Sequence, residues 1–266
     1  MRPFLKWAGG KYRLVERIKS RLPLGSRLLE PFCGSCALSL NTDFQEFWLN
    51  DINQDLVRVY QIIQQTGPDF IDYCQSFFVP TNNLSERYYE LRNTFNETDE
   101  NRLKAALFLY LNRHGYNGLS RYNAQGEFNV PFGRYKKPYF PSQELHYFYR
   151  KFENATFTHL DFETMMMSAR TGDVIYCDPP YLPLTATSNF TSYSAGGFGI
   201  DEQVRLAKVA AKVAKKGVMT VISNHYHPFI LEIYQEAHIE TFPVRRFISC
   251  NGSNRNEVLE ILAIFS

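Results

Sequence analysis

Short apolar runs alternate with helical patterns along most of the chain. Two of these runs, at residues 26–30 and 47–51, end in an acid and predict strands. Residues 53–65 predict a helix, with Asn53 as its cap. Further strands are predicted near residue 155 and at 173–177, 218–223, 240–245 and 257–265. Two further helices are predicted at 201–216 and 228–236.

This alternation is typical of an α/β protein with a doubly wound sheet. The middle of the chain differs, because residues 69–112 predict three helices, among them 85–95 and 101–111, with no strand between them. Residues 113–141 are rich in Gly, Asn, Pro, Arg and Tyr and predict a long structured loop with a hairpin near 124–127. We therefore expect one α/β catalytic domain, residues 1–55 and 146–266, interrupted by an insertion at 56–145.

Composition sets outer limits on this picture. A chain of 266 residues with 44% hydrophobic content can bury a substantial core as one domain with an insertion or as two small domains. No apolar run of about eighteen residues and no secretory leader is evident, so we expect a cytoplasmic protein. The five cysteines are odd in number, which favours reduced thiols, and the pair Cys33 and Cys36 lacks the second pair that a structural zinc site needs.

The positive charge is concentrated in two regions. Residues 1–29 carry eight Lys or Arg against one acid, and residues 112–151 carry seven against two, although the formal net charge of the whole chain is only +2. Two basic regions on an otherwise acidic protein favour a polyanion partner, because neutralised phosphates release counterions. A solvated charged surface would explain either region alone, and the two together favour nucleic acid.

The strongest chemical signal is the acid–Pro–Pro–Tyr sequence that directly follows the apolar run at 174–177. An acid at the end of a buried strand, a turn stiffened by two prolines and an aromatic ring suit a planar amine such as that of adenine. Its lone pair is delocalised into the ring, and a carboxylate with a proline carbonyl could accept both amine hydrogens and expose that pair. Enzymes that act on a base must take it out of the duplex. The residues concerned are Asp178, Pro179, Pro180 and Tyr181.

A second group of residues is expected at the same edge of the sheet. Gly34 lies in the turn after the first strand and lets backbone approach a ligand closely. Asp51, 17 residues further on, ends the next strand, where a carboxylate can bind ribose hydroxyls. A nucleoside-containing cofactor suits this spacing better than a bare phosphate.

The order of these motifs resembles that of the alpha group of DNA amino-methyltransferases. Within that group the chain is similar to the Dam adenine methyltransferases, which methylate N6 of adenine in GATC with S-adenosylmethionine. The resemblance covers nearly the whole chain and implies a Rossmann-like methyltransferase sheet with a target-recognition insertion, acting on double-stranded DNA as a monomer near the nucleoid. It rests on residues 4–11, 31–34, 112–123, 126–141, 178–181 and 221–225, and on Arg245, Arg246, Asn251 and Gly252.

The resemblance also implies a role for individual residues. Those expected to contact S-adenosylmethionine are Trp7, Lys11, Phe32, Gly34, Asp51 and Asp178, and Asp178 and Tyr181 would hold the flipped adenine. Lys6 would read the first guanine, Leu119 and Pro131 the third base pair, and Arg121 the last one. Tyr116 would insert into the base stack and Asn117 would face the orphaned thymine. The residues expected along the phosphates are Arg134, Tyr135, Lys136 and Lys137.

The chain departs from the family pattern at Cys36, where these enzymes usually have a second glycine. A side chain there would crowd the cofactor if the backbone needs a positive φ. Cys177 precedes the acid–Pro–Pro sequence, which does not support a cysteine nucleophile of the kind used for carbon-5 methylation of cytosine.

Three other functions stay open at this point: a cytosine-N4 or RNA adenine methyltransferase, a DNA-binding module without activity, and a nucleotide-dependent dehydrogenase. A methyltransferase of different site specificity, from a phage or a restriction-modification system, also fits. A role of the protein in mismatch repair or in control of replication is implied only by the resemblance to the Dam family.

Overall fold

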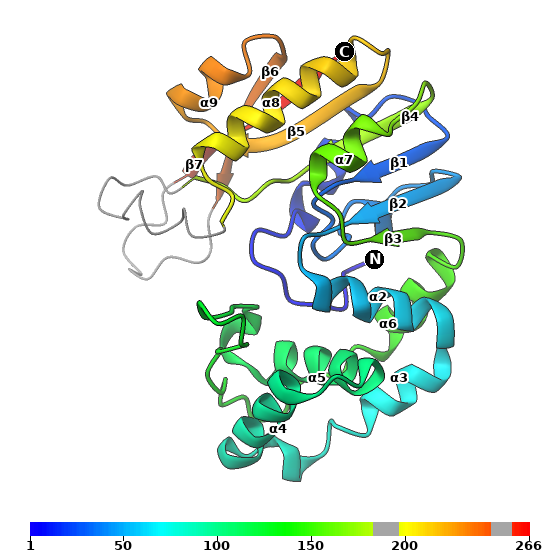
Figure 1. Ribbon diagram of the computed structural model, residues 1–266, viewed down its shortest axis with the longest axis vertical. Helices are drawn as coiled ribbons and strands as arrows, with labels where there is room; N and C mark the ends of the chain where they lie inside the picture. The colour runs from blue at the N-terminus through cyan, green and yellow to red at the C-terminus, as the bar shows by residue number, and fades with distance from the viewer. Residues whose placement is uncertain (183–196, 246–256) are drawn as a thin grey trace. The chain divides into compact units, whose positions relative to one another are not determined.

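The computed structural model describes residues 1–182, 197–245 and 257–266 (Figure 1). The chain forms two compact units. The helical unit comprises residues 1–16, 33–43 and 51–159, and the sheet unit comprises residues 17–32, 44–50 and 160–266. The chain first passes from the helical unit to the sheet unit within the short helix α1, Val15–Lys19.

The sheet unit contains strands in the order β2-β1-β4-β5-β7-β6 (Figure 1). Strand β1 is parallel to β2 and β4, β4 is parallel to β5, and β7 runs antiparallel to β5 and β6. This arrangement confirms the predicted doubly wound α/β sheet. The strand bounds are Arg27–Glu30 (β1), Glu46–Asn50 (β2), Asp173–Cys177 (β4), Met219–His225 (β5), His238–Arg245 (β6) and Glu257–Phe265 (β7).

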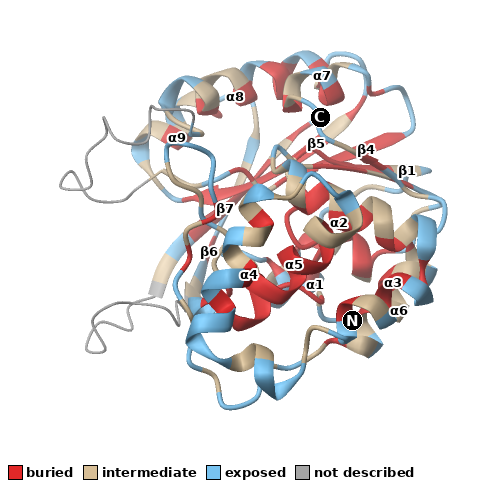
Figure 2. Ribbon diagram, turned by 60° about the horizontal axis from the view of Figure 1, so that its bottom comes forward, coloured by how far each residue is buried: buried red, intermediate tan, exposed pale blue. Residues whose placement is uncertain are grey.

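Three helices of the sheet unit pack on one face of these strands (Figure 2). Leu206, Val209 and Val213 recur at helical spacing along one side of the longest helix and are buried, which explains why that side faces the sheet. Every residue of β4 is buried, as expected of a central parallel strand. The helices are α7, Phe162–Met167, α8, Ile200–Ala214, and α9, Pro228–Ile233.

The strand order reverses at β1, which has β2 on one side and β4 on the other. Leu29 of β1 is in register with Ile175 of β4, so the carboxyl ends of these two strands lie at the same edge of the sheet. Doubly wound sheets bind ligands in the crevice outside such a reversal. Glu30, the last residue of β1, and Asp178, the first residue after β4, therefore lie at that edge.

The helical unit is built around helix α5, Asn101–His114. Residues 105–114 are all buried, which is typical of a helix surrounded by protein on every side. The predicted cap of α2 is confirmed, because the Asn53 side chain accepts a hydrogen bond from the Leu56 amide at 3.1 Å. The other elements are α2, Gln54–Thr66, α3, Pro68–Gln75, α4, Ser85–Glu97, α6, Ser142–Lys151, and strand β3, Thr156–Thr158.

The insertion has the predicted three helices, α3, α4 and α5, followed by a long loop. The hairpin expected near 124–127 is present, since the Asn123 amide donates to the Glu127 carbonyl at 2.9 Å beneath a bridge between Tyr122 and Phe128. Helices α1, α6 and α7 were not predicted. The expected domain boundary after residue 145 falls inside α6, and the division into catalytic domain and insertion stays a prediction.

Candidate active site

The Asp178 carboxylate lies at the end of a chain of hydrogen bonds that begins in the core of the sheet unit. Ser223 Oγ, on β5, donates to Asp178 Oδ1 at 3.0 Å, and Tyr176 Oη is 3.0 Å from the same serine oxygen. Because a serine hydroxyl has one hydrogen, Tyr176 must be the donor of the second bond. Burial, and next the Asp178 charge, raises the pKa of the Tyr176 phenol well above its usual value, so this donor stays protonated.

The two residues that close the motif are also held from the sheet unit. The Pro180 carbonyl accepts a hydrogen bond from Gln203 Nε2 at 2.9 Å. Gln203 is fully buried on α8, and its Oε1 accepts a bond from Asn224 Nδ2 at 3.0 Å. Tyr181 donates to Glu260 Oε2 at 3.4 Å, and its ring lies 4.0 Å from the His225 ring, centre to centre. The turn after β4 is therefore fixed by buried side chains of α8, β5 and β7.

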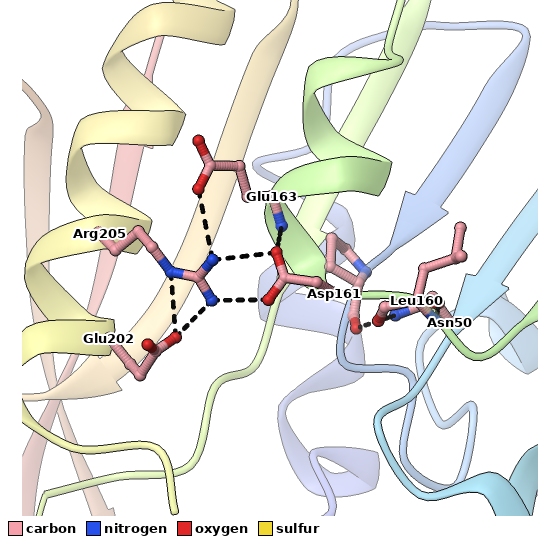
Figure 3. A network of polar contacts seen from close by, with 7 residues as sticks. Asn50, Leu160, Asp161, Glu163, Glu202 and Arg205 are labelled. Atoms are coloured by element: carbon pink, nitrogen blue, oxygen red, sulfur yellow. Dashed lines mark hydrogen bonds and ion pairs between the residues drawn. The ribbon is translucent and has the colours of Figure 1, made fainter. Parts of the chain in front are cut away.

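Helix α8 is in turn fastened to α7 by a network of ion pairs (Figure 3). The guanidinium of Arg205 binds both oxygens of Asp161, at 2.6 and 3.1 Å, and also contacts Glu202 and Glu163. Burial alone would raise the pKa of Asp161, but the hydrogen bonds from Arg205 and from the Glu163 amide outweigh it and lower that pKa. This network fixes the turn of α8 that carries Gln203.

An aromatic cluster lies beside this network in the sheet unit. The Phe32 ring, just beyond β1, is 5.4 Å from the Phe162 ring and 5.2 Å from the Phe198 ring. Arg205 also lies 4.2 Å over the Phe162 ring. Phe162 and Asp161 were not among the predicted site residues, although the acid and aromatic pair after the strand pattern near residue 155 was a signal that could have been used.

In the helical unit, Gly34 is the point where three side chains meet. Its amide donates to Asp51 Oδ2 at 2.9 Å, and its carbonyl accepts a bond from Tyr60. A Cβ at Gly34 would lie 2.7 Å from Trp7 Nε1, so only glycine, here at φ +44°, permits this approach. Three of the predicted cofactor residues are therefore brought together around one turn.

Asp51 accepts a second backbone bond, from the Asn53 amide to Oδ1 at 2.9 Å. Burial raises the pKa of the Asp51 carboxyl despite these two bonds. Lys11 is buried, and its Nζ donates to the Gly9 carbonyl at 3.0 Å, which shapes the turn after Trp7.

Backbone strain coincides with the predicted sites. In the described residues, the non-glycine positions with positive φ are Cys36 at +58°, Asn117 at +54° and Arg134 at +53°. Cys36 therefore has the positive φ at which a side chain was expected to crowd the cofactor, and this side chain is fully buried. Such strain is concentrated at functional sites in proteins generally.

The loop that was predicted to read DNA is held by side chains bonded to its backbone. Arg121 forks onto Asn129, with Nε 2.7 Å from the side-chain oxygen and Nη2 3.2 Å from the carbonyl. The Pro131 carbonyl accepts a bond from the Tyr116 amide at 2.8 Å, and the Tyr116 side chain is 52% exposed. Leu119 is half-buried.

The residues expected along the phosphates do not share one environment. Arg134, Lys136 and Lys137 are exposed. Tyr135 is half-buried, its hydroxyl accepts a bond from the Asn117 amide at 3.0 Å, and its ring lies 4.1 Å beneath Lys6 Nζ. Lys6, Asn117 and Tyr135 thus form one cluster.

Three residues on which the resemblance rests, Arg246, Asn251 and Gly252, lie outside the described residues. Among the residues described, no group of three or more His, Cys, Asp or Glu side chains is arranged to bind a metal ion. No helix within residues 1–182, 197–245 and 257–266 has the length and apolarity to cross a membrane.

A doubly wound sheet with an acid–Pro–Pro–Tyr turn at its strand reversal is typical of proteins that bind a nucleotide-type ligand at this edge. Comparison with known proteins specifies this class. The family model for D12 class N6 adenine-specific DNA methyltransferases matches residues 7–246, and the chain belongs to this family.

Curated relatives agree over their full length. The DNA adenine methylase of Escherichia coli (strain K12) is 47% identical over 264 residues, which are 99% of this chain and 95% of the relative. The protein of the same name from Vibrio cholerae serotype O1 (strain ATCC 39541) is 47% identical over 266 residues, 100% of this chain and 96% of the relative. The protein of the same name from Serratia marcescens is 48% identical over 265 residues, which are 99% of this chain and 98% of the relative. The predicted family and the predicted methylation of adenine in DNA are confirmed.

Proposed function

We propose that the protein transfers a methyl group from S-adenosylmethionine to N6 of adenine in duplex GATC, after flipping the adenine out of the helix. Membership of the family accounts for the adenine and the DNA. The observation that carries the rest is the Asp178 carboxylate, which is held by Ser223 at the end of β4 and followed by the Pro–Pro–Tyr turn.

The residues present suit a nucleoside-containing methyl donor. A carboxylate such as that of Asp51, which is half-buried, accepts hydrogen bonds from ribose hydroxyls, and aromatic rings such as Phe32 stack on a purine. The Gly34 turn brings Trp7 and Asp51 together, because its amide binds Asp51 and its missing side chain leaves room for the Trp7 ring. We propose that Trp7, Lys11, Phe32, Gly34, Asp51 and Asp178 bind the donor, which supplies a methyl group on a positively charged sulfur.

The adenine amine is then activated by acceptors of the turn. One amine hydrogen bonds to Asp178, and the other bonds to the Pro179 carbonyl, because the neighbouring Pro180 carbonyl already accepts the bond from Gln203. Both bonds favour a pyramidal nitrogen whose lone pair attacks the methyl carbon, and the carbon–sulfur bond breaks as the carbon–nitrogen bond forms. N6 loses one proton, which Asp178 accepts. Tyr181 holds the base by contact with its ring.

Base recognition is assigned to the helical unit. Lys6 reads the first guanine, Leu119 and Pro131 contact the third pair, and Arg121 reads the last pair, since Lys and Arg donate to guanine O6 and N7. Tyr116 fills the gap left by the flipped base and Asn117 faces the orphaned thymine. Arg134, Lys136 and Lys137, which are exposed, bind phosphates together with Tyr135.

The test is methyl transfer from tritiated S-adenosylmethionine to short duplexes that contain GATC or GATC changed at one position. Plasmid treated with the enzyme is then digested with a nuclease that cuts only N6-methylated GATC and with one that cuts only the unmethylated site. We expect label only in the GATC duplex and a matching switch in digestion. Label in duplexes that lack GATC would overturn the assigned site, and label on cytosine would overturn the assigned base.

A further inference from the structure

The backbone of Lys6 is clamped by a single side chain of helix α5. The Lys6 amide donates to Asn112 Oδ1 at 2.9 Å, and Asn112 Nδ2 donates to the Lys6 carbonyl at 2.7 Å. The same Nδ2 donates to the Gly118 carbonyl at 3.1 Å. Asn112 is only 1% exposed, and both hydrogens of its side-chain amide bond to these two segments, 106 and 6 residues away.

The Lys6 side chain is confined as well. At Gly118, where φ is +64°, a Cβ would lie 2.4 Å from Lys6 Cβ and Cδ, so the glycine backbone lies directly against the lysine stem. At the other end, Lys6 Nζ lies 4.1 Å over the Tyr135 ring, a cation–π contact. The Tyr135 hydroxyl accepts the bond from the Asn117 amide, which links this ring to the same turn of the loop.

This confinement matters because a lysine is a point charge on a flexible stem. An unconstrained lysine binds any nearby phosphate or base acceptor and loses about 2 kcal/mol of rotamer entropy when it is fixed. A lysine whose backbone and stem are already fixed meets one base edge and discriminates between bases. Asn112 is the one side chain in the described cluster that bonds to both Lys6 and the Gly118 turn.

We propose that Asn112 is a positioning residue for sequence discrimination: it fixes Lys6 against the recognition loop so that Lys6 reads the first base pair of the site. This inference rests on the proposed role of Lys6. It predicts that Asn112 acts on specificity through Lys6 and has no effect of its own on methyl transfer.

The chain contains a matched control for this clamp. Asn96, on α4, binds the Phe128 backbone in the same way, with Oδ1 2.8 Å from the Phe128 amide and Nδ2 3.2 Å from its carbonyl. Asn112→Asp and Asn96→Asp each keep the acceptor and lose the amide donors. Both variants therefore disturb one clamp in the helical unit, and only the first disturbs Lys6.

The experiment measures equilibrium binding of fluorescent duplexes that contain GATC or the site changed at its first or last base pair, together with thermal unfolding of each variant. Binding is used so that the result does not depend on methyl transfer. We expect Asn112→Asp to reduce discrimination at the first pair about tenfold and to leave the last pair unchanged. Asn96→Asp should leave discrimination at the first pair intact, and the melting temperatures show how far each variant is destabilised.

A double variant decides whether Asn112 acts through Lys6. In the Lys6→Ala background, Asn112→Asp should cause no further loss at the first pair, because the residue that it positions is gone. Loss of first-pair discrimination in Lys6→Ala but not in Asn112→Asp would overturn the inference alone. Full discrimination in Lys6→Ala would overturn the role of Lys6 and the inference with it, whereas failure of methyl transfer by a protein that discriminates normally would overturn only the proposed reaction.

Discussion

The turn after β4 and the loop at residues 115–137, which follows α5, are both irregular segments with predicted functions, but they are held in different ways. The turn is fixed by fully buried groups of neighbouring elements, among them Ser223 and Gln203. The loop is fixed by side chains that bond to its own backbone or to the N-terminal segment, such as Arg121 and Asn112. A change at the turn should therefore alter the rate on every substrate, and a change in the loop should alter which substrate is chosen.

The largest effect is expected at Asp178. Asp178→Ala removes the acceptor that activates the amine and should lower kcat by at least about 10²- to 10³-fold, the range seen when one electrostatic group of an active site is lost. Binding of duplex DNA should change little, because the proposed contacts with the phosphates and with the other base pairs of the site lie in the helical unit. Single-turnover methylation and equilibrium binding measure the two quantities, and near-normal turnover would refute the catalytic assignment.

The next effect is expected at Ser223, which tests whether the buried chain orients the carboxylate. A hydrogen bond to a charged group contributes about 1.5 to 3 kcal/mol, so Ser223→Ala should lower kcat roughly 10- to 100-fold with little change in KM for DNA. Ser223→Thr retains a hydroxyl and should recover most of the rate.

Thr220 provides a control for Ser223 on the same strand. Its buried Oγ1 has no hydrogen-bond partner in the described residues, so Thr220→Val removes a buried hydroxyl without breaking a bond. An equal loss of kcat in Thr220→Val and Ser223→Ala would show that β5 tolerates no change, and would remove the support for a specific role of Ser223.

A smaller effect concerns the acid stability of the helical unit beneath the loop. Burial lowers the pKa of His114 to about 4, and its ring stacks on Tyr110 at 4.0 Å. The unfolded chain, whose histidine titrates near 6.5, binds more protons below that pH, so this contribution is complete above pH 6.5 and is lost as the pH falls toward 4. The free energy of unfolding should fall by about 2 kcal/mol between pH 7 and pH 5.

Urea unfolding at several pH values measures this slope. His114→Gln cannot titrate and should reduce the slope in that window. An unchanged slope would show that other groups set the acid stability.

The smallest effect is expected at Cys36. The left-handed conformation at this position costs about 1 to 2 kcal/mol for any residue other than glycine, so Cys36→Gly removes that cost. The same change also removes a buried thiol. These contributions oppose each other, so stability should change by less than about 1 kcal/mol. Affinity for S-adenosylmethionine should stay the same or increase, and a large loss measured by calorimetry would contradict this expectation.

The sequence by itself determined the order of the strands along the chain, the helical insertion and the position of the acid–Pro–Pro–Tyr turn. Strand and helix periodicity are local, and β4 and the cap at Asn53 were found for that reason. Helices α1, α6 and α7 escaped prediction, and α6 did so because it follows directly on a segment rich in loop-forming residues.

Only the tertiary structure decided which side chains hold the functional groups in place. Asp178 and Ser223 are 45 residues apart, and Lys6 and Asn112 are 106 apart. A hydrogen bond between such residues depends on how strands and helices meet in space, and no local spacing encodes it. The chemistry could therefore be read from a short motif, whereas the means of orienting it required the packed fold.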